Sequence, residues 1–173
     1  MVDEILDVVD ENDKVIGTES YSKCHDNKIL HRGSVVFIFE DDSYNRLLLT
    51  RRGKTVKSPL KITVPGGHVG AGHSYLETAE KEKREEVFEG IDFPNGIILK
   101  EIFKIKKIHN NCSMFITAYR AVYSGPFSPS KEECEEAFFV DFETLFEKYS
   151  DQLSYTGNIL LNEYKKRYFR GDE

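Results

Sequence analysis

Three glutamates, Glu82, Glu85 and Glu86, have the spacing that brings side chains to one face of a helix. Residues at i, i+3 and i+4 lie within an arc of roughly 100°, because an α-helix has about 3.6 residues per turn. Ser74 followed by Glu77 has the pattern of a capping box, which predicts that the helix begins at Ser74. Carboxylate oxygens are good ligands for Mg²⁺, and substrate phosphates can complete its shell. The spacing therefore favours a divalent-cation site, with a solvated acidic helix face as the alternative.

A cluster of basic residues precedes this helix, at the end of an expected strand and in the loop after it: Arg51, Arg52, Lys54 and Lys57. In an acidic chain, such a cluster could hold the phosphates of an anionic substrate through charge-assisted hydrogen bonds. Solvated loop charge is the alternative for any single member. We predict that Arg51, Arg52 and Lys57 bind substrate.

The segment GHVGAGHSYLETAEKEKREEVF, which begins at Gly67, resembles the Nudix box. This loop–helix signature belongs to hydrolases that cleave a nucleoside diphosphate linked to another group. Gly67 matches the first glycine of the family pattern, and Glu82, Glu85 and Glu86 match its three metal-binding glutamates. The resemblance implies an α/β/α sandwich with a mixed sheet, a loop–helix catalytic motif, and Mg²⁺ or Mn²⁺ as the cofactor.

Four box positions depart from the family pattern. His73 replaces the first glutamate, Lys81 the arginine, Lys83 an aliphatic residue and Phe88 the second glycine. Arginine can hold a carboxylate in two-point contact, whereas lysine offers only a point charge. Groups that support metal ligands commonly tune affinity or activity by ~10–100-fold. The metal ligands are therefore retained, and their altered surroundings predict a changed rate.

The chain upstream of the box is similar to the branch of the superfamily that contains isopentenyl diphosphate isomerase and its hydrolase-like relatives. The matching pieces include Asp10-Glu11, Cys24-His25, Leu30-His31-Arg32, the run LLLTRR that ends at Arg52, and Gly67-His68. In the isomerase, histidines at the positions of His25, His31 and His68 hold a divalent metal together with acidic residues. These positions are a second candidate metal site, and three separate structural histidines are the alternative. The isomerase's catalytic cysteine has no counterpart, because Gly66 stands in its place.

The acidic segment 132–136, followed by Phe138-Phe139-Val140, resembles the family's C-terminal element. Glu133 there aligns with a glutamate that can supply a metal ligand or a base. The candidate catalytic residues are therefore Glu82, Glu85, Glu86 and Glu133. An exposed acidic turn is the alternative for Glu133.

Length and composition predict one folded domain over residues 1–173, with about 70% of the unfolded surface buried. A hydrophobic content of 39% argues against disorder. The net charge of −6 argues against nucleic acid and anionic membranes as partners. The acidic N-terminus does not look like a signal peptide. The cysteines Cys24, Cys112 and Cys134 lack a metal-ligand spacing such as C-x-x-C, which predicts free thiols in a cytoplasmic protein.

Hydrophobic patterns and turn residues predict alternating strands and helices. We expect strands at 5–10, 14–19, 33–40, 46–51, 62–64, 97–107, 112–123 and 137–140, and helices from Ser74 to near Gly90 and at 141–148 and 155–169. Strands mixed with a few helices suit a sheet layered between helices.

The function that we expect is the metal-dependent hydrolysis of a diphosphate linkage in a small molecule, with a homodimer as the assembly to consider. A catalytically weak or inactive module that binds a nucleotide or diphosphate is the first alternative. An enzyme like the isoprenoid diphosphate isomerase is the second, and the missing cysteine argues against it.

Overall fold

The computed structural model describes residues 3–88, 97–109 and 112–169. The chain divides into two compact units. The first consists of Met1–Phe37, Pro65–Glu85 and Phe93–Ala121, and the second of Ile38–Val64, Glu86–Asp92 and Val122–Glu173. The expectation of a single domain over 1–173 stays a prediction.

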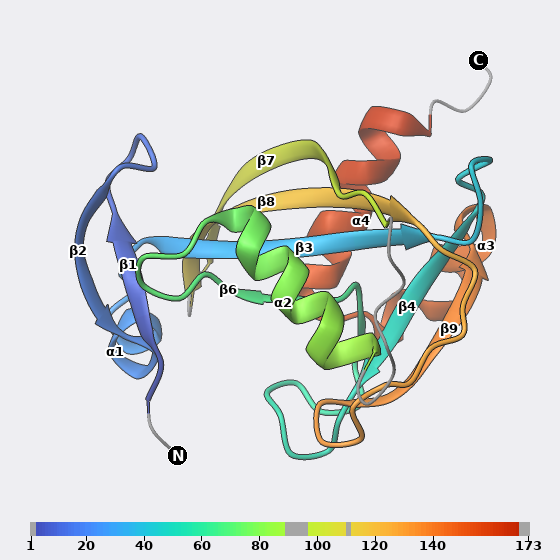
Figure 1. Cartoon of the computed structure of the whole chain (residues 1–173), viewed down its shortest axis with the longest axis horizontal. Helices are drawn as coiled ribbons and strands as arrows, with labels where there is room; N and C mark the ends of the chain where they lie inside the picture. The colour runs from blue at the N-terminus through green and yellow to red at the C-terminus, as the bar shows by residue number, and fades with distance from the viewer. Residues whose placement is uncertain (1–2, 89–96, 110–111, 170–173) are drawn as a thin grey trace. The chain divides into compact units, whose positions relative to one another are not determined.

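A central strand, β3 (His31–Phe39), organises the first unit. Its apolar run is buried along its whole length, as is usual for a strand covered on both faces. β3 pairs antiparallel with β6 (Gly66–His68), while its neighbour β8 (Cys112–Val122) runs in the same direction as β3 (Figure 1). β8 in turn pairs antiparallel with β7 (Lys100–His109). Parallel and antiparallel neighbours together make the mixed sheet that we expected.

A separate hairpin precedes β3 in the first unit. β1 (Ile5–Val9) and β2 (Val15–Ser20) pair antiparallel, and the short helix α1 (Tyr21–Asp26) follows them. Backbone hydrogen bonds attach this hairpin to the unit, from Val9 N to Leu30 O at 2.9 Å and from Ala71 N to Ile5 O at 2.8 Å. The hairpin thereby contacts both the start of β3 and the loop that leads to the helix α2 (Tyr75–Val87).

The second unit combines strands with the two C-terminal helices. Its elements are β4 (Arg46–Arg52), β5 (Ile62–Thr63), β9 (Cys134–Asp141), α3 (Phe142–Tyr149), the 3₁₀ turn Ser150–Gln152 and α4 (Tyr155–Tyr168). β4 pairs antiparallel with both β5 and β9. The hydroxyl of Ser154 caps α4 by accepting from Gly157 N at 2.9 Å. A Cβ at Gly157 would lie 3.1 Å from Ile62 O, so glycine permits the close approach of α4 to β5.

Most of the elements expected from sequence are present, and the α/β class is confirmed. α1 and β6 were not expected, because a six-residue helix and a three-residue strand carry little periodicity. The expected helix end at Gly90 lies outside the described residues. The three cysteines are free, as predicted, and all three are buried. Among the helices that the structure describes, none is long and apolar enough to cross a membrane.

Candidate functional site

The predicted capping box is present at the start of α2. The carboxylate of Glu77 accepts from the backbone N–H of Ser74 at 2.7 Å and from its hydroxyl at 2.8 Å. The backbone N–H of Glu77 donates to the Ser74 hydroxyl at 3.2 Å. These reciprocal bonds satisfy N–H groups that a helix start leaves without partners. The helix start is therefore set locally, as the sequence indicated.

Glu82 lies directly against Gly67, which explains why a glycine occupies the first position of the box. A Cβ added at Gly67 would overlap the carboxylate of Glu82. Only a glycine lets the backbone of β6 approach this carboxylate so closely. The loop and the helix of the box therefore meet at the carboxylate of Glu82, which the sequence analysis predicts to bind metal.

Lys81, which replaces the arginine of the family pattern, pairs with Glu85 at 3.5 Å. Burial acts to lower the pKa of Lys81, but the charges of Glu85, Glu82 and Glu4 outweigh it and raise that pKa. Both partners are about half exposed, so this ion pair is screened by solvent. Lys81 therefore offsets part of the negative charge of the acidic helix, without the two-point contact that an arginine could make.

Glu86, further along α2, is buried with 9% of its surface exposed. In the second unit it lies near Cys134, whose thiol pKa is raised to about 12, chiefly by burial and then by the charge of Glu86. The backbone carbonyl of Glu86 accepts from Ser130 N at 3.2 Å. Burial of a carboxylate costs free energy, which hydrogen bonds or paired charges offset.

Two of the predicted phosphate-binding residues have partners within the second unit, with a partner of Arg51 in β9 and one of Arg52 in the loop after β4. Arg51 donates to Glu136 at 2.7 Å and to Gln152 at 3.1 Å, and Arg52 donates to the carbonyl of Lys57 at 2.7 Å. The register of β4 and β9 sets Arg51 directly opposite Glu136. These cations therefore have protein partners already.

Glu133, the remaining candidate catalytic residue, is exposed just before β9. Its backbone carbonyl accepts from Gly53 N at 2.7 Å. A Cβ at Gly53 would overlap the carbonyl of Glu132, so the loop after β4 and the acidic segment are in close contact. Glu133 and the basic loop thus lie side by side in the second unit.

The three candidate histidines converge in the first unit, although they come from α1, β3 and β6. The Nε2 atoms of His25 and His68 are 3.1 Å apart, and Nε2 of His31 lies 3.9 Å from the Sγ of Cys112. One ligand atom from each of these four side chains lies within 4.8 Å of all the others. Cys112 was missed because its distance in sequence from the histidines hides any ligand spacing.

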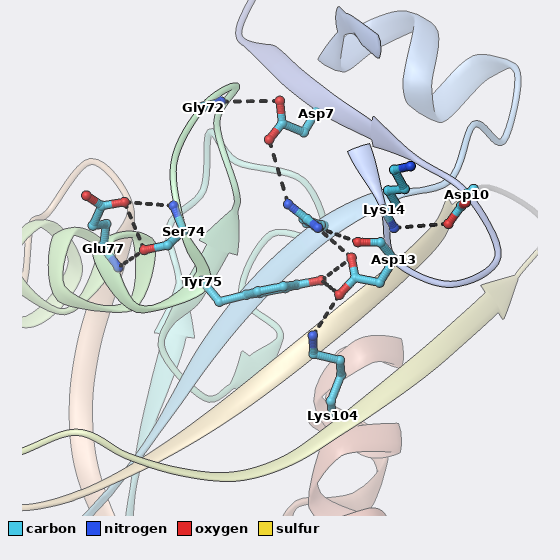
Figure 2. A network of polar contacts seen from close by, with 10 residues as sticks. Asp7, Asp10, Asp13, Lys14, Gly72, Ser74, Tyr75, Glu77 and Lys104 are labelled. Atoms are coloured by element: carbon cyan, nitrogen blue, oxygen red, sulfur yellow. Dashed lines mark hydrogen bonds and ion pairs between the residues drawn. The ribbon is translucent and has the colours of Figure 1, made fainter. Parts of the chain in front are cut away.

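A second polar cluster, centred on Asp13, was also missed (Figure 2). Asp13 lies in the β1–β2 turn and accepts hydrogen bonds from Arg32 at 2.7 Å, from Lys104 at 2.7 Å and from the hydroxyl of Tyr75 at 2.9 Å. Burial acts to raise the pKa of Asp13, but these three donors outweigh it and lower that pKa. Because Tyr75 is the first residue of α2, the cluster ties the start of the box helix to the hairpin.

A cavity of about 620 Å³ opens in the first unit beside the start of α2. Its lining includes His68, His73, Glu77 and Lys81. His73 and Lys81 are two of the positions at which the box departs from the family pattern. The substitutions therefore face a space large enough for a small ligand.

A family model described as the NUDIX domain matches residues 29–156, which is more than half of the chain. The chain belongs to the Nudix family.

The isomerase-like alternative needs a cysteine at position 66, where this Nudix chain has no room for a side chain. A Cβ added at Gly66 would overlap the carbonyl of Ser34 and the side chain of Val35, because β6 pairs with β3 there. Gly66 thus has a structural reason to be glycine where the isomerase has its cysteine.

Relatives of this Nudix chain include both hydrolases and isomerases by name. It is 40% identical over 88 residues to an uncharacterized Nudix hydrolase of Streptomyces coelicolor, covering 49% of this chain and 47% of that protein. It is 38% identical over 88 residues to an isopentenyl-diphosphate Delta-isomerase of Serratia proteamaculans, covering 50% and 48%. The chain spans about half the length of these curated relatives.

The crystal structure of DR0079 from Deinococcus radiodurans has the same fold as this Nudix chain. The TM-score is 0.76 at 20% sequence identity, and the match covers 95% of this chain and 99% of that one. At this level of identity the similarity establishes the fold alone.

Proposed function

We propose that the protein is a divalent-metal-dependent Nudix pyrophosphohydrolase that acts on a diphosphate linkage in a small molecule. The substrate class is a nucleoside diphosphate linked to another group, or a similar compound. The observation that carries the proposal is the position of the Glu82 carboxylate against Gly67. This contact joins the loop and the helix of the box. An acidic helix face that was only solvated would not require such a contact.

The donors on α2 fit a hard cation. Glu82, Glu85 and Glu86 offer only carboxylate oxygens, which suit Mg²⁺ or Mn²⁺. When bound, the metal supplies neutralisation of developing negative charge and a lower pKa for an attacking water. Lys81 would limit repulsion along the acidic helix by its pairing with Glu85.

The remaining residues would bind the substrate and move one proton. Arg51, Arg52 and Lys57 would contact non-bridging phosphate oxygens, with Arg51 exchanging its bond to Glu136 for one to substrate. Water attacks one phosphorus, the bridging P–O bond breaks, and the bridging oxygen leaves with the other phosphate group. The proton of the water passes to a general base, for which a boxed glutamate, Glu133 and a histidine remain candidates. The products are a nucleoside monophosphate, or its equivalent, and a phosphorylated leaving group.

The altered box favours one other function, a module that binds a nucleotide or diphosphate without cleaving it. Lys81 holds Glu85 without the two-point contact of an arginine, and the geometry of the metal ligands depends on such supporting contacts. A weakly supported site can retain binding after turnover is lost.

A panel of ADP-linked and related diphosphates, assayed with Mg²⁺ and with Mn²⁺, tests the proposal. We expect a phosphorylated product from at least one compound, and none after chelation of the metal. Glu82→Gln should abolish this release, whereas Glu80→Gln, on the same helix but outside the metal-binding positions, should retain it. Thermal protection by a diphosphate without cleavage across the panel would favour the binding module instead. Migration of a double bond without release of phosphate would favour the isomerase.

A further inference from the structure

Tyr75, the first residue of α2, is held from several sides within the first unit. Its hydroxyl donates to the carboxylate of Asp13, whose two oxygens lie 2.9 and 3.0 Å away (Figure 2). The cations of Arg32 and Lys104 lie 5.3 and 4.4 Å from the centroid of its ring. The hydroxyl of Ser34 donates to the backbone carbonyl of Tyr75 at 2.8 Å. Both the side chain and the backbone of this residue are therefore fixed.

We propose that Tyr75 is a positioning residue for the metal site, because it fixes α2 so that the carboxylate of Glu82 lies against Gly67. Asp13, in the β1–β2 turn, is the group that holds Tyr75 in place. Because Glu82 is a metal ligand in the proposed function, this role rests on that function. It adds a requirement that the box does not contain, namely the hairpin that precedes the box in the chain.

Helix geometry connects Tyr75 to Glu82. Glu82 is the seventh residue after Tyr75, and at about 3.6 residues per turn this spacing is close to two full turns, so both residues lie on the same face of α2. They are about 10.5 Å apart along the helix axis, at ~1.5 Å per residue. Because each turn is hydrogen-bonded to the next, a shift of the first turn carries Glu82 with it.

One pair of residues in the β3–β6 ladder receives both contacts from α2. Ser34 of β3 lies directly opposite Gly67 of β6. Ser34 is fully buried and donates to the carbonyl of Tyr75, whereas a Cβ added at Gly67 would overlap the carboxylate of Glu82. The first turn of α2 and its metal-binding carboxylate therefore rest on neighbouring backbone. Fixing Tyr75 leaves α2 little freedom to turn or slide along the ladder.

The capping box alone does not account for these contacts. Ser74 and Glu77 satisfy N–H groups at the helix start by bonds to each other. A helix that only had to begin at this point would not require the bond to Asp13. Burial, and then the hydrogen bond to Asp13, raise the pKa of Tyr75, so its hydroxyl stays protonated and remains a donor. The bond to the hairpin therefore sets where the helix lies, not where it begins.

The hairpin also holds the loop before α2. Asp7 of β1 is buried and accepts from the backbone N–H of Gly72 at 3.2 Å (Figure 2). Arg32 connects the two aspartates, because it donates to Asp13 at 2.7 Å and lies 3.8 Å from Asp7. One network therefore attaches both the loop and the helix of the box to the hairpin. Removal of groups that orient metal ligands commonly changes metal affinity or activity by ~10–100-fold.

Tyr75→Phe tests this role on the full chain, because it removes the hydroxyl and keeps the ring. We expect Mn²⁺ affinity in calorimetry to fall by about 10-fold. On the best diphosphate substrate, kcat should fall while KM changes by less than about twofold, the pattern of a lost contribution to the transition state. Tyr119→Phe is the matched control, because it removes the hydroxyl of a buried tyrosine on β8 in the same unit. It should keep the wild-type affinity and kcat.

Two lysines of β7 provide a second, independent comparison. Lys104→Met removes a cation that contacts both Asp13 and the ring of Tyr75, and it should weaken Mn²⁺ binding by about twofold to fivefold, as expected for a partly exposed ion pair. Lys106→Met removes the ion pair with Glu11 on the same strand and should leave the affinity unchanged. Asp13→Asn combined with Tyr75→Phe should bind Mn²⁺ no more weakly than the more affected single variant, because both changes act on the same bond.

A folded Tyr75→Phe protein with a lower Tm but with wild-type Mn²⁺ affinity and kcat would overturn the proposal, because the network would then only stabilise the fold. Equal losses in Tyr119→Phe or Lys106→Met would also overturn it. If Tyr75→Phe does not fold, the comparison of Lys104→Met with Lys106→Met decides the question. Wild-type protein that binds no Mn²⁺ would refute the metal site of the proposed function, whereas failure of this role alone leaves wild-type binding intact, so the two failures are distinguishable.

Discussion

Replacement of Asp13 by asparagine tests the polar cluster that joins the hairpin to the start of α2. Asp13 adopts the left-handed conformation, with φ of 63°, which asparagine tolerates, so Asp13→Asn removes charge without backbone strain. The side chain of Asp13 is only 12% exposed, and that of Arg32 only 17%. A hydrogen bond to such a charged group contributes about 1.5–3 kcal/mol. Lys104 is 39% exposed, so its ion pair adds less than about 1 kcal/mol.

The free energy of unfolding should therefore fall by about 2–3 kcal/mol in Asp13→Asn. The loss is no larger because the amide oxygen of asparagine still accepts one of the hydrogen bonds. For a chain of this size, such a loss lowers Tm by roughly 4–12 °C. Denaturant unfolding at pH 7 measures the loss. Asp10→Asn is the matched control in the same turn, where the carboxylate accepts local bonds from Asn12 N and Lys14 N. It should cost less than about 1 kcal/mol.

The loss of stability in Asp13→Asn should also depend on pH. Burial acts to raise the pKa of Asp13, but hydrogen bonds from Lys104, Arg32 and Tyr75 lower it in the folded state. The stabilisation is therefore present above the unfolded-state pKa of about 3.9 and is lost as the pH falls through the folded-state pKa. The difference between wild type and Asp13→Asn should shrink below about pH 4. Equal stability of the two proteins at pH 7, or a difference that stays constant on acidification, would refute the reasoning.

Three further predictions concern the box. Glu85→Gln removes one charged oxygen ligand and should weaken Mn²⁺ binding in calorimetry, and an unchanged affinity would return the helix to a solvated acidic face. Lys81→Arg combined with His73→Glu should raise turnover on the best substrate by restoring two-point contact and the missing carboxylate, whereas lower or unaltered activity would indicate a different working arrangement. Gly67→Ala should displace Glu82 and lower both Mn²⁺ affinity and activity, and wild-type values for both would contradict the packing reason for this glycine.

Local spacing determined the parts of this protein that depend on neighbours within a few residues. Ser74 and Glu77 predicted the start of the box helix, because a capping box needs only residues three apart. Glu82 and Glu85 lie within four residues of Glu86, so helix geometry predicted that all three carboxylates extend from one helix, which is α2. The alternation of strands and helices likewise gave the α/β class.

Strand pairing decided what the sequence alone left open. Cys112 approaches His31 from 81 residues away, and Glu136 meets Arg51 from 85 residues away. Such contacts depend on which strands become neighbours and in what register, and these are set by burial of the whole sheet rather than by local pattern. For the same reason a chain without any C-x-x-C spacing can place a thiol among three histidines. The sequence predicted the helix of the box, whereas the partners of Cys112 and Arg51 could be identified only from the pairing of the strands.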